Sequence, residues 1–105
     1  MSIEKTLVVC EYTAKADKSA ELEGLLATHW GTLHKLGLTT DPPARVLKGA
    51  KAESHDAGGK YLEIFSWKSE NSMKLAHETP EVMAIWEGIG ACCSALDFPT
   101  YHDIT

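Results

Sequence analysis

The stretch Ser66–Ile89, SWKSENSMKLAHETPEVMAIWEGI, decides the fold that the sequence predicts. A strand ends at Trp67, and a short helix follows it, with Ser69 well placed as the helix cap. Thr79-Pro80 closes this helix and begins a second one, because proline at the first helical position loses no needed hydrogen bond. In the second helix, apolar residues recur at spacings of three and four and form one stripe. The stripe consists of Val82, Ile85, Trp86, Ile89, Cys93 and Leu96.

Length and composition indicate a single globular domain. The chain has 105 residues, which is enough for one hydrophobic core. Its net charge of -5 and its unclustered Lys and Arg residues argue against a nucleic-acid partner. No apolar run approaches the roughly 20 residues that span a bilayer, and the first residues lack the pattern of a signal peptide. The 3 cysteines form no CxxC pair, which favours the reducing cytoplasm.

The first part of the chain predicts a strand followed by a long helix. Thr6–Thr13 is rich in β-branched and aromatic residues, and both of its faces are largely apolar. The helix should be capped by Asp17 and end near Leu36, with Gly37 as its stop signal. His29 lies on or beside the apolar stripe of this helix, as a packed histidine or as a ligand. The stripe consists of Leu22, Leu25, Leu26, His29, Leu33 and Leu36.

Two weaker strands and a polar loop are also expected. Residues 41–43, Asp-Pro-Pro, favour a turn, after which Ala44–Lys51 has the polar composition of an edge strand. The polar loop Ala52–Lys60 carries His55 beside Asp56, either exposed to solvent or as a lid over a pocket, and Gly58-Gly59 should make its final turn. Thr100–Ile104 should be a short closing strand.

Lys60–Trp67, KYLEIFSW, is the clearest strand, because its two faces differ in character. Leu62, Ile64 and Ser66 share a mainly aliphatic face, which suits packing against a layer of helices. The other face combines aromatic side chains with a carboxylate, as walls of binding cavities do. It carries Tyr61, Glu63, Phe65 and Trp67.

The element order is therefore β-α-β-β-(α)-α-β, which favours an α+β, ferredoxin-like fold. Such a fold has a four-stranded antiparallel sheet with its helices on one face. The other face of the sheet would be apolar and uncovered in a monomer. A two-fold homodimer, sheet against sheet, would bury it.

Several of these residues resemble a known family. The run SWKS, Met73, Ala76-His77, the run TPEV and Trp86 are similar to those of the antibiotic biosynthesis monooxygenase-like proteins of the dimeric α+β barrel superfamily. The resemblance implies a homodimer with one pocket in each subunit, between the sheet and the helices. The characterised enzymes of the family oxidise quinols or polycyclic aromatics with molecular oxygen and use neither flavin nor metal. The family thus implies no cofactor, but fold-level analogy alone does not fix a function.

The haem-degrading branch of the family is not supported. Its members need an Asn on the first strand, a Trp in the short helix and a His in the following helix. Alignment through SWKS places Cys10, Ala76 and Trp86 at these positions. All three residues depart from the pattern, so we reject haem degradation.

The remaining reaction class requires a dry pocket, ring-binding walls and a base near a phenolic oxygen. His77 is the candidate base, because an unperturbed histidine has a pKa of about 6.5, which is near the operating pH. Tyr12 is the candidate catalytic hydrogen-bonding group. The candidate substrate-binding residues are Tyr61, Glu63, Phe65, Trp67, Trp86 and Cys10. No metal site is expected, since no histidine has a second ligand at helical spacing.

Each candidate also has a purely structural interpretation. His77 could interact with a helix end through the helix dipole, and Trp67 and Trp86 could be core residues. Tyr12 could lie in an interface, and Cys10 could be a small buried hydrophobe. The leading hypothesis is a cofactor-independent monooxygenase-like protein that acts on a small aromatic or quinol metabolite. The alternatives are a non-catalytic small-molecule-binding barrel and a dimerisation module with a filled core.

Overall fold

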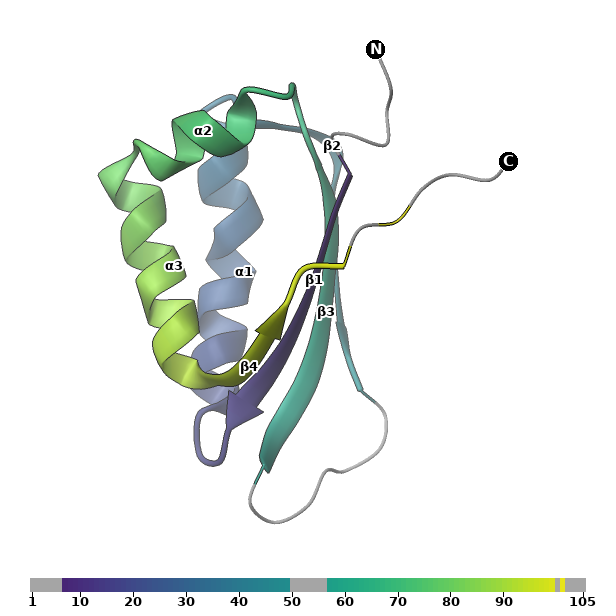
Figure 1. Cartoon of the computed structure of the whole chain (residues 1–105), viewed down its shortest axis with the longest axis vertical. Helices are drawn as coiled ribbons and strands as arrows, with labels where there is room; N and C mark the ends of the chain where they lie inside the picture. The colour runs from purple at the N-terminus through teal and green to yellow at the C-terminus, as the bar shows by residue number, and fades with distance from the viewer. Residues whose placement is uncertain (1–6, 50–56, 100, 102–105) are drawn as a thin grey trace.

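The computed structural model describes residues 7–49, 57–99 and 101. The elements follow the order β1 (Leu7–Lys15), α1 (Ser19–Lys35), β2 (Thr39–Lys48), β3 (Ala57–Trp67), α2 (Ser72–His77), α3 (Pro80–Cys92) and β4 (Cys93–Asp97). The strands form an antiparallel sheet in the order β2-β3-β1-β4. All helices of the described residues lie on one face of this sheet (Figure 1). The predicted ferredoxin-like α+β fold is confirmed.

The hydrophobic core fills the space between the sheet and the helices and has two parts. One part includes Leu22 and Leu26 of α1, packed with Ile89 of α3. The other part includes Leu33, packed with Phe65 and Trp67 of β3. Val8 and Trp86 pack against both parts, so the boundary between the two clusters lies beside these side chains.

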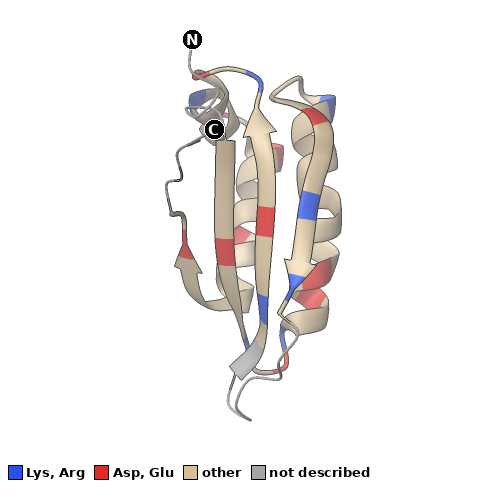
Figure 2. Cartoon of the chain, turned by 90° about the vertical axis from the view of Figure 1, so that its right-hand side faces the viewer, with Lys and Arg blue, Asp and Glu red and all other residues tan. Residues whose placement is uncertain are grey.

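The two faces of β3 have the opposite roles from those expected for a helix layer. The face with Glu63 and the aromatic residues is buried beneath the helices, and Glu63 is 0% exposed. Ile64 and Leu62 lie on the free face, which Figure 2 views from the side away from the helices. The prediction that the aliphatic face packs against the helices is wrong. A buried carboxylate needs hydrogen-bond donors, and His29 of α1 lies within hydrogen-bond distance of the Glu63 carboxylate. This contact requires the face of β3 that carries Glu63 to lie beneath the helices.

The last helix is shorter than predicted, and β4 takes over its expected end. Cys93 has an extended backbone, with φ -109 and ψ 140, and pairs with Ala14 of β1. Leu96 pairs with Tyr12, and an irregularity in the register separates the two pairs. In a regular strand, residues at a spacing of three lie on opposite faces, but this irregularity places Cys93 and Leu96 on the same face. Their spacing is therefore the same as that of residues on one face of a helix. The strand predicted over 100–104 lies outside the described residues except for Tyr101, which has no regular structure.

Strand β2 runs through the segment that was expected to be a turn. It begins at Thr39, and its register shifts between Thr40 and Arg45, around Pro42 and Pro43. The strand tolerates these prolines because it forms an edge of the sheet, as predicted, and needs fewer ladder hydrogen bonds. His55 and Asp56 lie outside the described residues. Gly59 belongs to β3 and not to a turn.

The helix ends agree with the sequence in part. Gly37 ends α1 as predicted, with a left-handed φ of 77 and a hydrogen bond from Leu38 N to Leu33 O of 3.0 Å. Asp17 does not cap α1, because it has a φ of 73 in the turn before the helix and Lys18 occupies the cap position. Thr79 does precede α3, with Pro80 at the first helical position. Its hydroxyl, however, donates to Leu75 O at 2.9 Å instead of accepting from an amide.

Candidate functional site

A cavity of about 380 Å³ lies between the sheet and the helices. Strands β1 and β3 provide its floor, α1 and α3 contribute side chains to its interior, and α2 and the end of β4 contribute to its rim. The lining residues are mainly apolar or aromatic: Val8, Cys10, Tyr12, His29, Phe65, Trp67, Met73, His77, Trp86, Ile89, Leu96 and Phe98. Such a cavity has the size and composition of a site for a small organic molecule.

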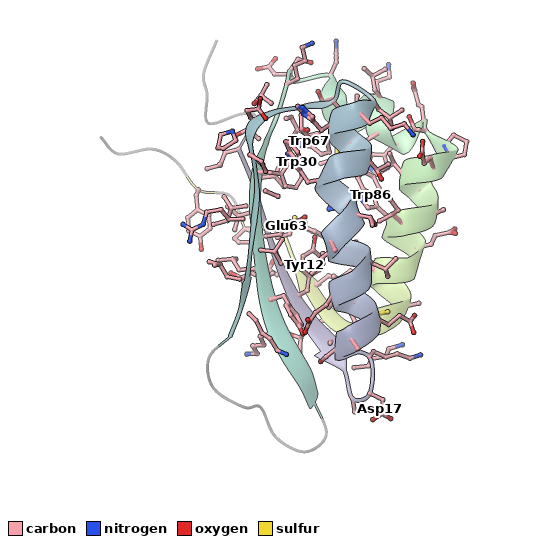
Figure 3. All side chains as sticks on the ribbon, turned by 180° about the vertical axis from the view of Figure 1, so that it is seen from behind. Tyr12, Asp17, Trp30, Glu63, Trp67 and Trp86 are labelled. Carbon is pink, nitrogen blue, oxygen red and sulfur yellow. The ribbon has the colours of Figure 1, made fainter. Side chains whose placement is uncertain are left out.

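A chain of hydrogen bonds crosses the interior beside this cavity. The indole Nε1 of Trp86 donates to Nε2 of His29 at 2.8 Å. Nδ1 of His29 lies 2.9 Å from Oε2 of Glu63. The hydroxyl of Tyr12 donates to Oε1 of Glu63 at 2.7 Å. In Figure 3, Glu63 and Tyr12 lie at the side of the sheet that faces the helices, and Trp86 lies beside α1 and α3.

The donors in this chain fix the position of each proton. The indole N–H of Trp86 can only donate, so Nε2 of His29 accepts and carries no proton. A neutral imidazole then carries its proton on Nδ1, which donates to Glu63. The carboxylate of Glu63 is the acceptor of both His29 and Tyr12, which is the role of the ionised form. His29 is therefore neutral in this arrangement, and the negative charge lies on Glu63.

The buried carboxylate and the dry surroundings suppress ionisation of the neighbouring side chains. Burial and the charge of Glu63 raise the pKa of Tyr12 far above its usual value. Burial, with a smaller contribution from Glu63, raises the pKa of Cys10 to about 12, although a hydrogen bond with Tyr12 opposes this shift. Tyr12 thus remains a hydrogen-bond donor. Cys10 lines the cavity as a neutral thiol and not as a nucleophile.

The predicted residues are brought together with one exception. Cys10, Tyr12, Phe65, Trp67, His77 and Trp86 line the cavity, and Glu63 lies behind it, bonded to Tyr12. Tyr61 is not among the residues that line it, and its hydroxyl donates to Glu23 of α1 at 2.5 Å. His77 is exposed, and its ring meets that of Trp86 edge-on with centroids 4.9 Å apart.

His29 is the main residue of the site that the sequence did not assign to it. It is 3% exposed, lines the cavity and bonds to both Glu63 and Trp86. A usable signal was present in the sequence, because a histidine on an apolar helix stripe and a carboxylate on a buried strand face both need partners. The alternation of β3 did identify Glu63, but local patterns could not show that α1 crosses above it.

Within the described residues, no group of three or more His, Cys, Asp or Glu side chains is arranged to hold a metal ion. None of the helices in the described part of the chain has both the length and the apolar composition to cross a membrane.

Comparison with known proteins establishes the fold. No protein-family profile matches the sequence, and no curated protein is similar to it in sequence. Among solved structures, SnoaB, a cofactor-independent oxygenase from Streptomyces nogalater, has a TM-score of 0.71 and 13% identity, over 95% of this chain and 93% of SnoaB. An antibiotic biosynthesis monooxygenase has a TM-score of 0.63 and 11% identity, over 92% of this chain and 98% of that chain.

A further similar structure is that of At3g17210 from Arabidopsis thaliana. Its TM-score is 0.72 at 12% identity, over 95% of this chain and 96% of that protein. The chain therefore has the fold of the antibiotic biosynthesis monooxygenase-like proteins, as the resemblance in sequence indicated. At these identities the comparison concerns the fold, and the function has to be argued from the site.

Proposed function

We propose that the protein is a cofactor-independent monooxygenase that acts on a small aromatic or quinol metabolite. The observation that carries the proposal is the aromatic cavity of about 380 Å³, with histidine and tyrosine side chains among its lining residues. An apolar cavity excludes water and binds a ring, and a polar group at its wall can orient a phenolic oxygen. The oxygenase and monooxygenase among the similar structures support the same reaction class.

The reaction balances without an added reductant. For an anthrone-like phenol, one oxygen atom of O₂ replaces the two hydrogens of the ring methylene and becomes a carbonyl oxygen. The other oxygen atom leaves with these hydrogens as water, and the substrate supplies all four electrons. The protein has to remove the phenolic or enolic proton, hold the ring and keep water away.

The proposed roles of the side chains follow from their positions. Phe65, Trp67 and Trp86 provide the aromatic walls, and Tyr12 supplies a hydroxyl that Glu63 holds in place. His77, which the sequence predicted as the base, lies at the exposed side of the lining, and its ring contacts that of Trp86.

We also propose that the protein is a cytoplasmic homodimer. Leu7 and Leu47 are each 40% exposed on the sheet face that the helices leave free, and a second copy would cover them. The unpaired, buried cysteines support a reducing compartment.

Oxygen uptake tests the proposal. The purified protein is supplied with hydroquinones and anthrone in turn, without added flavin or metal and with a chelator present. We expect uptake faster than autoxidation with the heat-denatured protein, and conversion of the ring methylene of anthrone to a carbonyl group. Uptake no faster than this control with every substrate of the panel, while the native protein binds at least one of them, would refute the enzyme.

One observation favours a second function, a non-catalytic binder of small aromatics. The polar groups of Trp86, His29, Glu63 and Tyr12 are hydrogen-bonded to one another, so in the resting protein these four side chains present an aromatic wall to a bound ring but no free base. A binder would show quenching of tryptophan fluorescence by the same compounds without oxygen uptake.

A further inference from the structure

We infer that Nε2 of His29 is the proton acceptor of this site, and that a hydroxylated ring uncovers it by taking the place of the Trp86 indole N–H. This inference deepens the proposed function and rests on it for its biological meaning. The ligand class is a small phenol, quinol or enol, because the displaced donor must be replaced by an acidic O–H group. The inference concerns His29, which the sequence left open between a packed residue and a ligand.

The ring of His29 is oriented as a base, but its unprotonated nitrogen is occupied by a hydrogen bond. Nε2 carries no proton and accepts the Trp86 N–H at 2.8 Å, while Nδ1 is held by Glu63 at 2.9 Å. Glu63 is 0% exposed and receives the Tyr12 hydroxyl, so its charge and position are fixed by packing. A carboxylate on one imidazole nitrogen fixes the tautomer, orients the ring and stabilises the imidazolium that forms when the other nitrogen takes a proton.

Trp86 is well placed to be displaced by a ligand. It lines the cavity and is only partly buried, whereas His29 is 3% exposed. Its ring meets the ring of His77 edge-on, with centroids 4.9 Å apart, and His77 is exposed. A ligand that enters the cavity therefore meets a side chain that can shift outward, and this shift would free Nε2 of His29.

The proton transfer is simple and needs no other reactant. The ligand O–H bond breaks, its proton forms a bond to Nε2, and the electron pair stays on the ligand oxygen. The ligand becomes an oxyanion and His29 becomes an imidazolium, whose Nδ1–H remains on Glu63. The new imidazolium lies beside a carboxylate within a dry interior, where opposite charges attract strongly. The buried carboxylate of Glu63 is paired with His29 at 2.9 Å, so the support that it gives belongs to His29 and not to His77.

The test uses 4-nitrophenol, whose phenolate absorbs visible light and whose neutral form does not. The protein is titrated with it at a pH at which free 4-nitrophenol is protonated. We expect the phenolate band on binding to the unaltered protein, with no oxygen required. His29→Gln should bind the dye without the band, whereas His34→Gln, an exposed histidine of the same helix, should keep it.

Two more variants test the role of the Trp86 N–H and compare His77 with His29 as the base. Trp86→Phe keeps an aromatic wall but removes the N–H that the dye has to displace, so the band should form at lower dye concentration, on the order of fivefold. His77→Gln should leave the band in place. Loss of the band in His77→Gln together with its retention in His29→Gln would overturn the inference, as would wild-type protein that fails to ionise the dye.

A measurement on the unaltered protein covers the case in which His29→Gln does not fold. Nitrogen-resolved NMR spectra of the imidazoles should show His29 with one proton on Nδ1 in the free protein, and a second proton on Nε2 once 4-nitrophenol is bound. A ring that stays neutral in the complex would overturn the inference. Dye ionisation without oxygen uptake on any substrate would refute the enzyme and keep the inference, and uptake that persists in His29→Gln would do the reverse.

Discussion

The Nδ1 atom of His29 on α1 lies 2.9 Å from the Oε2 atom of Glu63 on β3, and both side chains are buried. This contact joins the helix layer to the sheet between residues that are 34 positions apart in the sequence. It therefore serves the fold and the cavity together, because it fixes the two layers and orients the ring that the cavity contains. Four consequences of the structure can be measured.

The first prediction concerns the bond between Tyr12 and Glu63. Tyr12→Phe leaves the buried carboxylate with one donor fewer, and Glu63→Gln removes its charge, so each change should lower the free energy of unfolding by about 1–3 kcal/mol. Because the two side chains contact each other, the double variant should lose less than the sum, with a coupling energy of about 0.5–3 kcal/mol. Urea denaturation of the four proteins measures this coupling.

Thr28→Ala is a matched control for this cycle, because its hydroxyl makes an exposed bond to Leu25 O. We expect a change within about 0.5 kcal/mol and no coupling to Glu63. Strict additivity of Tyr12→Phe and Glu63→Gln would contradict the hydrogen bond between them.

The fold could be predicted because its signals are local. Each of the signals that predict the order of the elements depends on a few neighbouring residues. Examples are the alternation of side chains along β3 and the helix boundary at Thr79-Pro80. The errors arose where pairing with a distant strand decided the outcome. Cys93 and Leu96 kept a helical spacing, yet they pair with Ala14 and Tyr12 of β1 in a strand with an irregular register.

The site could be predicted only in part, for a related reason. The buried face of β3 identified Glu63, Phe65 and Trp67 as neighbours of the cavity, because side chains alternate along a strand. Whether His29 contacts Glu63 depends on how α1 crosses the sheet, and the sequence pattern of α1 does not predict this crossing. Tyr61 has the same alternation as Glu63 but lies beyond the reach of the cavity, where it bonds to Glu23.

The second prediction concerns alkaline pH. The pKa of Cys10 is raised from 9.0 to about 12 by burial, so the native protein holds this proton at pH values at which the unfolded chain releases it. The associated stability is complete below about pH 9 and is lost as the pH rises toward 12, by up to ~1.4 kcal/mol per pH unit. The raised pKa of Tyr12 acts in the same direction at higher pH.

Urea denaturation midpoints measured at several pH values between 8 and 11 test this prediction about Cys10, because the midpoint should fall as the stability falls. Cys10→Ala should decline less steeply with pH than the unaltered protein, whatever its stability at neutral pH. Parallel curves for the two proteins would show that the thiol of Cys10 does not hold its proton in the native state.

The third prediction compares two glycines of α3. A Cβ atom on Gly90 would meet no atom within 4 Å, whereas one on Gly88 would lie 3.1 Å from Cδ1 of Leu25. Gly90→Ala should therefore raise the free energy of unfolding by about 1 kcal/mol through helix propensity. Gly88→Ala gains the same propensity but presses against α1, so its net effect should be smaller. Equal gains in thermal denaturation would show that α1 and α3 are less closely packed.

The fourth prediction concerns the sheet face that the helices leave free. Ile64 lies on this face, paired with Val9 of β1 and Arg45 of β2. If a second copy covers the face, Ile64→Lys places a charge in the interface and should convert the dimer to a monomer, since an unpaired buried charge is costly. Analytical ultracentrifugation measures the change.

Ala84→Lys provides the comparison, because it adds the same charge to an exposed position of α3 on the opposite side of the molecule. This variant should sediment as the unaltered protein does. Because the cavity lies on the helix side of the sheet, a monomeric Ile64→Lys protein should still bind 4-nitrophenol. An unaltered protein that sediments as a monomer at all concentrations would exclude the homodimer, and dimers of Ile64→Lys would move the interface to another face.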